Sequence, residues 1–284
     1  MAENEKLLPV FVAGPARSGT TMLTLALSAH PEVCLAEGVK EVNFFNKYFD
    51  RGLDWYADLF EGCEPGRTRG EVSNLYFYHP EVPGRVRSAL PDAKIVVTLR
   101  DPYERLCSVY RYWTGREKLD RDTTLVDVVA DPTHPIVRMN RYGTLLERWY
   151  AALPAEQIHV ALFDLLRSDP DRYLEEVADF LEIEGDAMEA RADSGSNRAI
   201  QGRFPGVGRL ARRTGELLRA SGLRGLLGWL KRSSLVRRLL FTKPSTSSRE
   251  LLTDDVVEAL RPVLNPEIER AEQATGRTLA RWKR

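Results

Sequence analysis

The first apolar run of the chain leads directly into a glycine-containing loop and then into a helical pattern, over Leu7–Thr21. We expect residues 8–13 to form a buried strand and residues 18–29 a helix that ends at His30 and Pro31. At such a junction the loop and first-turn N–H groups point at one spot, and the helix dipole favours negative charge there. The segment therefore predicts a site for a phosphate or a similar anion.

The loop comes close to the G-x-x-x-x-G-K-S/T pattern of nucleotide-triphosphate loops. Gly14 and Gly19 have the required spacing, and Thr21 supplies the hydroxyl. The lysine position is Thr20, however, and the nearby cation is Arg17, three residues earlier. We expect the loop to bind a phosphate without the lysine that reaches the β- and γ-phosphates in ATPases.

Further apolar runs alternate with helical patterns along the chain. Residues 94–99 (KIVVTL) form a continuous apolar run, as expected of a strand covered on both faces, and residues 157–163 (QIHVALF) form another. This alternation predicts an α/β fold with a doubly wound parallel sheet, a P-loop-like phosphate-binding loop and helices on both faces. We expect residues 1–284 to form a single domain, in which the first strand and strand 94–99 end at the same crevice.

A second candidate site follows strand 94–99. Arg100 lies where a parallel strand delivers its side chain into the crevice, and Ser108 lies about two turns into the next helical pattern. A guanidinium and a hydroxyl together can hold a phosphate. Two separate phosphate sites indicate a bis-phosphorylated nucleotide rather than a triphosphate.

Several segments resemble, in order along the chain, the motifs of sulfotransferases that use 3′-phosphoadenosine-5′-phosphosulfate (PAPS). GPARSGTT followed by SAHPEV, and later TLRDPYERLCSVYRYW, resemble the 5′-phosphosulfate and 3′-phosphate motifs. KEVNFFNKYFDRGLDWYADLF, RYGTLLERW and AIQGRFP resemble the carbohydrate branch of that family, the heparan sulfate type. The resemblance covers residues 8–205 and, more loosely, 251–282.

The resemblance implies roles for individual residues. Those that would hold the donor PAPS and its product, 3′-phosphoadenosine-5′-phosphate (PAP), are Arg17, Ser18, Gly19, Thr20 and Thr21 at the 5′-phosphosulfate, Arg100 and Ser108 at the 3′-phosphate, and Gln201, Gly202 and Arg203 closing over the nucleotide. Glu41 would be the general base, with Glu37 as the alternative base.

One position departs from the heparan sulfate type, which has a lysine where this chain has Arg17. An arginine there resembles tyrosylprotein sulfotransferases and many bacterial sulfotransferases, so the acceptor class stays open. We expect in-line transfer of a sulfuryl group to a hydroxyl of a carbohydrate or a glycolipid. Arg17 would neutralise charge on the leaving nucleotide and Glu41 would take the hydroxyl proton. The sequence contains no His/Asp cluster typical of a metal site, and we expect no metal.

Two other functions stay open. The first is a nucleotide kinase or NTPase, against which Thr20 at the lysine position and the second phosphate site both argue. The second is a non-catalytic module that binds a nucleotide or an anionic surface.

The segment Arg203–Lys243 carries eleven Lys or Arg residues and one Glu, a net charge of +10 in a chain of zero formal net charge. Apolar residues are interleaved with the charges, which predicts a pair of amphipathic helices in a basic subregion, residues 203–245. In one interpretation this subregion contacts an acidic membrane or an anionic acceptor, and in the other it covers the core. The charges lack a recognisable aromatic platform, so we do not expect a nucleic-acid partner.

The three cysteines, Cys34, Cys63 and Cys107, are widely spaced and match neither a metal-binding nor a disulfide pattern. We therefore expect reduced thiols and a cytoplasmic protein, peripheral to a membrane at most. The N-terminal residues MAENEK are acidic, which does not match a signal peptide, and no apolar stretch reaches membrane-spanning length.

Overall fold

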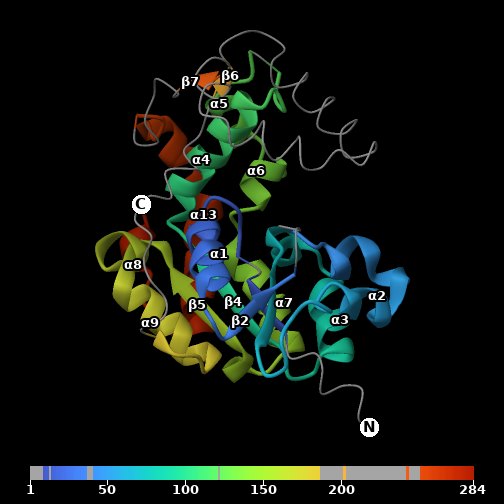
Figure 1. Cartoon of the computed structure of the whole chain (residues 1–284). Coiled ribbons are helices and arrows are strands. Elements are labelled where there is room, and N and C mark those ends of the chain that lie inside the picture. Colours follow the sequence, from blue (N-terminus) through green and yellow to red (C-terminus); the bar gives the residue numbers. More distant parts are fainter. Residues whose placement is uncertain are drawn as a thin grey trace. The chain divides into compact units, whose positions relative to one another are not determined.

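The chain divides into two compact units. The first comprises Met1–Arg105, Met139–Ser194 and Arg261–Arg284, and the second comprises Leu106–Arg138 and Gly195–Leu260. The computed structural model describes residues 9–12, 14–36, 41–120, 122–185, 201–202, 241–242 and 250–284 (Figure 1). The single domain expected over residues 1–284 stays a prediction.

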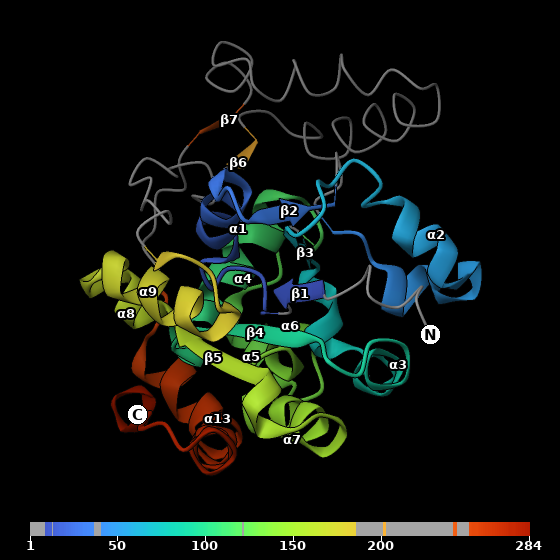
Figure 2. The same ribbon diagram turned by 60° about the horizontal axis from the view of Figure 1, so that its bottom comes forward.

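A five-stranded sheet with strand order β2-β3-β1-β4-β5 forms the framework of the first unit (Figure 2). Its strands are β1 (Pro9–Val12), β2 (Val33–Leu35), β3 (Thr68–Val72), β4 (Lys94–Leu99) and β5 (Ile158–Leu162). All neighbouring strands in this sheet are parallel, and Val10 of β1 pairs with Gly70 on one side and Lys94 on the other. The chain thus extends the sheet in both directions from β1, which confirms the predicted doubly wound α/β fold.

Helices α1 (Thr20–Ala29) and α9 (Pro170–Leu181) cover one face of this sheet. Their buried side chains share one hydrophobic cluster with buried residues of four strands, namely Val33, Val72, Val96 and Ala161. Ile95 and Val97 flank Val96 in β4 and are fully buried outside this cluster. Since side chains alternate across a strand, β4 is buried on both faces, which explains its continuous apolar run.

Helix α7 (Tyr142–Ala152) and the C-terminal part of α13 (Asp254–Thr275) lie on the other face of the sheet from α1 (Figures 1 and 2). The two helices are joined by a buried carboxylate, because Thr144 donates from its backbone nitrogen and its hydroxyl to Glu267 at 2.8 and 2.9 Å. Trp149 of α7 and Trp282 of the short helix η8 (Ala280–Trp282) are fully buried nearby in the same unit. This unit also contains α3 (Val82–Ala89), η5 (Ala155–Gln157) and α8 (Phe163–Ser168).

The segment that connects β2 to β3 contains a cluster of packed aromatic side chains. Its short helices are η2 (Phe44–Tyr48), η3 (Phe49–Arg51) and α2 (Gly52–Asp58). Phe44 and Phe45 are buried, and their ring centroids lie 4.7 and 5.6 Å from that of Tyr56. These aromatics therefore form core rather than an exposed platform for a sugar.

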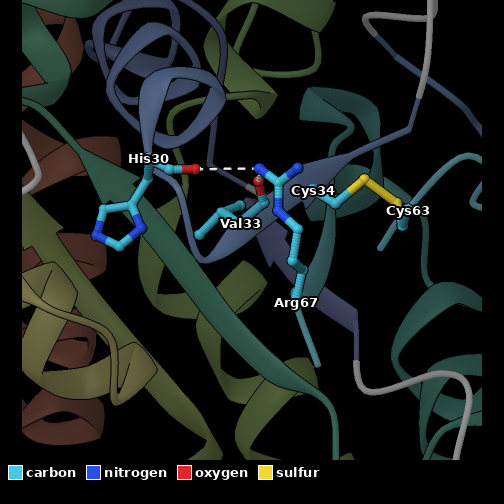
Figure 3. The surroundings of a disulfide bond; sticks show 5 residues. All are labelled: His30, Val33, Cys34, Cys63 and Arg67. Atoms are coloured by element: carbon cyan, nitrogen blue, oxygen red, sulfur yellow. Dashed lines mark hydrogen bonds between the residues drawn. A yellow bond between two sulfur atoms is a disulfide. The ribbon is translucent and has the colours of Figure 1, made fainter. Parts of the chain in front are cut away.

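A disulfide joins Cys34 of β2 to Cys63, with Cα atoms 5.8 Å apart (Figure 3). Beside it, Arg67 donates to the carbonyl oxygens of Val33 and, at 3.3 Å, His30. The prediction of reduced thiols is therefore wrong for Cys34 and Cys63, and the inference of a reducing cytoplasmic compartment loses its basis. Sequence spacing hides this pair because Cys34 and Cys63 are 29 residues apart, and only the folding of the intervening aromatic segment brings the second back to the edge strand.

The second unit contains the C-terminal part of α4 (Pro102–Gly115) together with α5 (Leu125–Ala130) and α6 (Pro135–Arg138). A capping box between Thr124 and Asp127 begins α5. The short antiparallel pair β6 (Gln201–Gly202) and β7 (Phe241–Thr242) also belongs to this unit, as does the part of α13 up to Leu260.

Most of the basic segment 203–243 lies outside the described residues, and so do its predicted amphipathic helices and membrane contact. Phe241 and Thr242 are described, and they lie in a strand instead of the expected helix because Phe241 pairs with Gly202. No helix in the parts of the chain that the structure describes is long and apolar enough to cross a membrane.

Candidate active site

The predicted phosphate-binding loop, residues 14–19, connects β1 to α1 and lies directly against β4. It is called the phosphate loop below. A Cβ atom at Gly14 would lie 2.1 Å from Thr98 Oγ1 and 2.4 Å from the Thr98 backbone nitrogen, so a larger residue does not fit. Gly19 precedes α1 with a φ of 93°, in the left-handed region that favours glycine. Its carbonyl oxygen accepts from the backbone nitrogens of Met22 and Leu23 at 3.0 and 3.3 Å. Gly14 thus allows the loop to pack closely against Thr98 of β4, and Gly19 allows the chain to turn into α1.

Ser18 places an unsatisfied polar group in this loop. Its side chain is 0% exposed, and its Oγ has no hydrogen-bond partner among the described residues. A buried hydroxyl without a partner costs about 1–3 kcal/mol, so a ligand atom fits as the missing partner. Thr20 and Thr21 follow in the first turn of α1, where backbone N–H groups have no acceptor within the helix. The loop therefore has the donors that an anion requires.

Arg17 lies in this loop with a φ of 75°, which few non-glycine residues adopt. A buried guanidinium holds the residue before it, because Arg105 Nε donates to the Ala16 carbonyl oxygen at 2.9 Å. The other acceptors of Arg105 are Met139 O at 2.9 Å, Asn140 Oδ1 at 2.7 Å and the Tyr78 hydroxyl.

Arg105 is 1% exposed, and sequence reasoning did not select it. The available signal was an arginine next to Leu106 and Cys107, on a helix with a buried apolar face. A cation there needs buried acceptors, and the phosphate loop provides one of them.

Glu41 follows β2 in the chain and lies beside the end of β3. Its φ is 78°, and its backbone nitrogen donates to the Val72 carbonyl oxygen at 3.0 Å. Asn74 binds both carboxylate oxygens, through its backbone nitrogen to Oε2 at 2.8 Å and through its side-chain Nδ2 to Oε1 at 2.6 Å. The Glu41 carboxylate is thus held in one orientation. Glu37, the alternative base, lies outside the described residues.

A second carboxylate, Glu71 of β3, is fully buried behind this turn. It accepts from the hydroxyls of Tyr56 at 3.0 Å, Tyr76 at 2.9 Å and Ser73 at 2.7 Å. Burial raises the pKa of Glu71 to about 7, although the three hydroxyls act in the opposite direction. The Ser73 hydroxyl also accepts from the backbone nitrogen of Asn43 at 3.2 Å, which links Glu71 to the turn that follows Glu41. Sequence reasoning missed Glu71 because nothing local distinguishes it from a surface carboxylate in a strand.

Arg100 follows β4, as predicted. Its guanidinium forms an ion pair with Glu104 at 2.8 Å and lies 4.9 Å from the centroid of the Phe163 ring. A Cβ atom at Gly19 would lie 3.0 Å from the same ring, so Phe163 contacts both the phosphate loop and Arg100. The structure therefore brings Arg100 close to the phosphate loop.

The remaining predicted site residues belong to the second unit. Ser108 is a buried residue of α4, and Gln201 and Gly202 form β6. Arg203 lies outside the described residues. The 3′-phosphate site and the loop that closes over the nucleotide therefore stay predictions. Among the described residues, no group of three or more His, Cys, Asp or Glu side chains is arranged to hold a metal ion.

The fold and the loop define a class, the α/β proteins with a P-loop-like junction between a strand and a helix. Within this class, the chain belongs to the sulfotransferase domain family, whose model matches residues 8–197.

Two human proteins illustrate the relationship. The chain is 33% identical over 195 residues to the bifunctional heparan sulfate N-deacetylase/N-sulfotransferase 3, covering 62% of this chain and 22% of that protein. It is 31% identical over 187 residues to heparan sulfate glucosamine 3-O-sulfotransferase 3A1, covering 63% of this chain and 45% of that protein. The chain thus spans less than half the length of either relative.

A solved sulfotransferase from Alicyclobacillus acidocaldarius has the same fold. The two structures agree with a TM-score of 0.67 over 97% of this chain and 98% of that one, at 22% sequence identity. The likeness confirms the α/β fold predicted from the sequence.

Proposed function

We propose that this protein transfers a sulfuryl group from PAPS to a hydroxyl of a carbohydrate or a glycolipid, with PAP as the second product. Membership of the sulfotransferase domain family supports the type of reaction. The relatives named for heparan sulfate support a carbohydrate acceptor. Thr20 at the first position of α1, where an NTPase has its lysine, argues against ATP as the donor.

The observation that carries the proposal is the unsatisfied Ser18 hydroxyl in a loop that also presents Arg17. PAPS supplies a sulfuryl group that is already activated by its bond to a phosphate. The residues proposed to hold its 5′-phosphosulfate are Arg17, Ser18, Gly19, Thr20 and Thr21. The positive charge of Arg17 stabilises the negative charge that develops on the departing oxygen.

The 3′-phosphate is proposed to bind Arg100 and Ser108. Arg100 is already held near the phosphate loop by Glu104 and Phe163. Gln201, Gly202 and Arg203 are proposed to close over the nucleotide. Two phosphate contacts on one nucleotide select a bis-phosphorylated compound over ATP.

Glu41 is the proposed general base. It takes the proton of the acceptor hydroxyl, and Asn74 keeps its carboxylate oriented while it does so. A positioned base contributes about 10²–10⁴-fold to the rate. Sulfuryl transfer, like phosphoryl transfer, depends mainly on such positioning and on electrostatic stabilisation.

The test is transfer of radiolabelled sulfate from PAPS to a panel of unsulfated glycosaminoglycan oligosaccharides, glycolipids and tyrosine-containing peptides, with ATP and Mg²⁺ in a parallel assay. We expect label on a glycan or glycolipid, lost about 100-fold or more in Arg17→Ala and retained in Arg87→Ala on the exposed side of α3. Label on the peptide alone contradicts the proposed acceptor class. Turnover of ATP without sulfate transfer contradicts the reaction.

A further inference from the structure

The short helix η4 (Asn74–Tyr78) directly follows β3 and the buried Ser73. Asn74 lies at its N-terminal end and Tyr78 at its C-terminal end, one helical turn later. Each of these two residues contacts a different part of the candidate active site, and both parts belong to the first unit.

At the N-terminal end, Asn74 contacts the proposed base. It donates to both oxygens of the Glu41 carboxylate, at 2.6 and 2.8 Å. Asn43 adds a contact from the other side, since its Nδ2 donates to the Glu41 carbonyl oxygen at 2.9 Å. The carboxylate of Glu41 is therefore tied to the start of η4.

At the C-terminal end, Tyr78 contacts the phosphate loop through one intermediate. Its hydroxyl accepts from Arg105, whose Nε donates to the carbonyl oxygen of Ala16, directly before Arg17. Burial raises the pKa of Tyr78, the charge of Arg105 lowers it and the charge of Glu41 raises it. The charges of both Arg105, which holds the phosphate loop, and Glu41, the proposed base, thus act on Tyr78.

The buried carboxylate of Glu71 also holds η4 in place. Ser73, directly before η4, and Tyr76, within it, both donate to Glu71. The Tyr76 hydroxyl also accepts from the backbone nitrogen of Phe45 at 3.2 Å. These hydrogen bonds attach η4 and the residue before it to β3 and to the start of η2.

We propose that Asn74, Tyr78 and Arg105 form a positioning bridge that sets the place of the Glu41 carboxylate relative to Arg17, and so the distance between acceptor and donor. The proposal rests on the proposed function, in which Glu41 is the base and Arg17 contacts the donor. Reacting atoms must be held about 3–3.5 Å apart, and a misplacement of about 1 Å costs on the order of 100-fold in rate. A bridge through one short helix meets that requirement without a direct contact between base and loop.

The test is a double-mutant cycle on Asn74→Ala and Tyr78→Phe in sulfate transfer, with Tyr173→Phe as the matched control. Tyr173 is a buried tyrosine of α9 in the core cluster on the α1 face of the sheet, and its hydroxyl has no partner among the described residues. We expect each bridge variant to lower kcat about 10-fold, with the KM for PAPS within about two-fold of wild type. The double variant should lose no more than the larger single loss, because both changes cut the same connection. Tyr173→Phe should retain wild-type kcat.

Losses in kcat that multiply in the double variant, or that follow the melting temperature across all variants, would overturn the bridge. Glu41→Gln in the same assay tests the proposed base separately from the bridge. A wild-type kcat in Glu41→Gln would show that Glu41 is not the base. In that case hydrogen–deuterium exchange decides. The bridge requires Tyr78→Phe to speed exchange in both the loop 14–19 and the turn 41–45, and unchanged exchange in either contradicts it.

Discussion

Gly14 and Thr98 lie in contact, so that a Cβ atom at position 14 would be 2.1 Å from the Thr98 hydroxyl oxygen. This contact packs the phosphate loop against β4, the strand that leads to Arg100. The relative placement of the two predicted phosphate contacts in the first unit therefore depends on a residue without a side chain.

Gly14→Ala should lower the free energy of unfolding by about 1–3 kcal/mol, because the added methyl group meets both the side chain and the backbone of Thr98. The matched control is Gly84→Ala, since a Cβ atom at Gly84 of α3 meets nothing within 4 Å. In a helix that change should stabilise the protein by about 0.5–1 kcal/mol. Denaturant unfolding measures both, and a Gly14→Ala variant as stable as wild type contradicts the packing described here.

Glu41→Gln should lower kcat for sulfate transfer by about 10²–10⁴-fold, because an amide cannot take the acceptor proton. PAP affinity should stay within about two-fold of wild type, since Glu41 is not proposed to contact the nucleotide. Glu37→Gln is the control that decides between the two candidate bases, and it should retain wild-type kcat. The opposite pattern, with Glu37→Gln inactive and Glu41→Gln active, assigns the base to Glu37.

Glu71 should make the stability of the protein fall as pH rises. Its pKa in the folded state is about 7, above the ordinary 4.5, so the folded state keeps a proton that the unfolded state has lost between these values. Its favourable contribution is complete below about pH 4.5 and is lost as pH rises through about 7, by up to about 3 kcal/mol. Urea unfolding of wild type and Glu71→Gln between pH 4.5 and 8 measures this loss, which should be absent from the variant. Glu175→Gln, on the exposed side of α9, should keep the wild-type pH dependence, and equal profiles for wild type and Glu71→Gln would contradict the account.

The disulfide between Cys34 and Cys63 should stabilise the protein by about 2–4 kcal/mol, as expected for a crosslink that closes a loop of this length. Adding a reductant should lower the free energy of unfolding of wild type by that amount. The double variant Cys34→Ser, Cys63→Ser should already have the lower value and should not respond to the reductant. Mass spectrometry of thiol-labelled protein under non-reducing conditions checks the pairing, and label on Cys34 and Cys63 of folded, non-reduced protein contradicts it.

The elements with the strongest local signals were predicted correctly from the sequence. The strand–loop–helix junction around Gly14 and Gly19 and the apolar run 94–99 are each visible within about ten residues, and both are confirmed. The position of Arg100 followed from the same reasoning, because a charged residue at the end of a buried strand must emerge at the edge of the sheet.

The break between α6 and α7 was not predicted from the sequence. Met139 and Asn140 lie between the two helices and turn acceptors towards Arg105, which is distant in sequence. The disulfide and the hydroxyls around Glu71 were missed for the same reason, since each joins segments that only the folded chain brings together. These features depend on burial and on contacts between residues that are distant in the sequence. A local sequence pattern contains neither kind of information.

The most direct test of the account is calorimetric titration of the protein with PAP, with ATP as the competing nucleotide. We expect tight PAP binding that is weakened at least about 10-fold in both Arg17→Ala and Arg100→Ala, retained in Arg87→Ala, and much weaker binding of ATP. No PAP binding by the folded protein, or ATP binding as tight as that of PAP, contradicts a site built for a bis-phosphorylated donor.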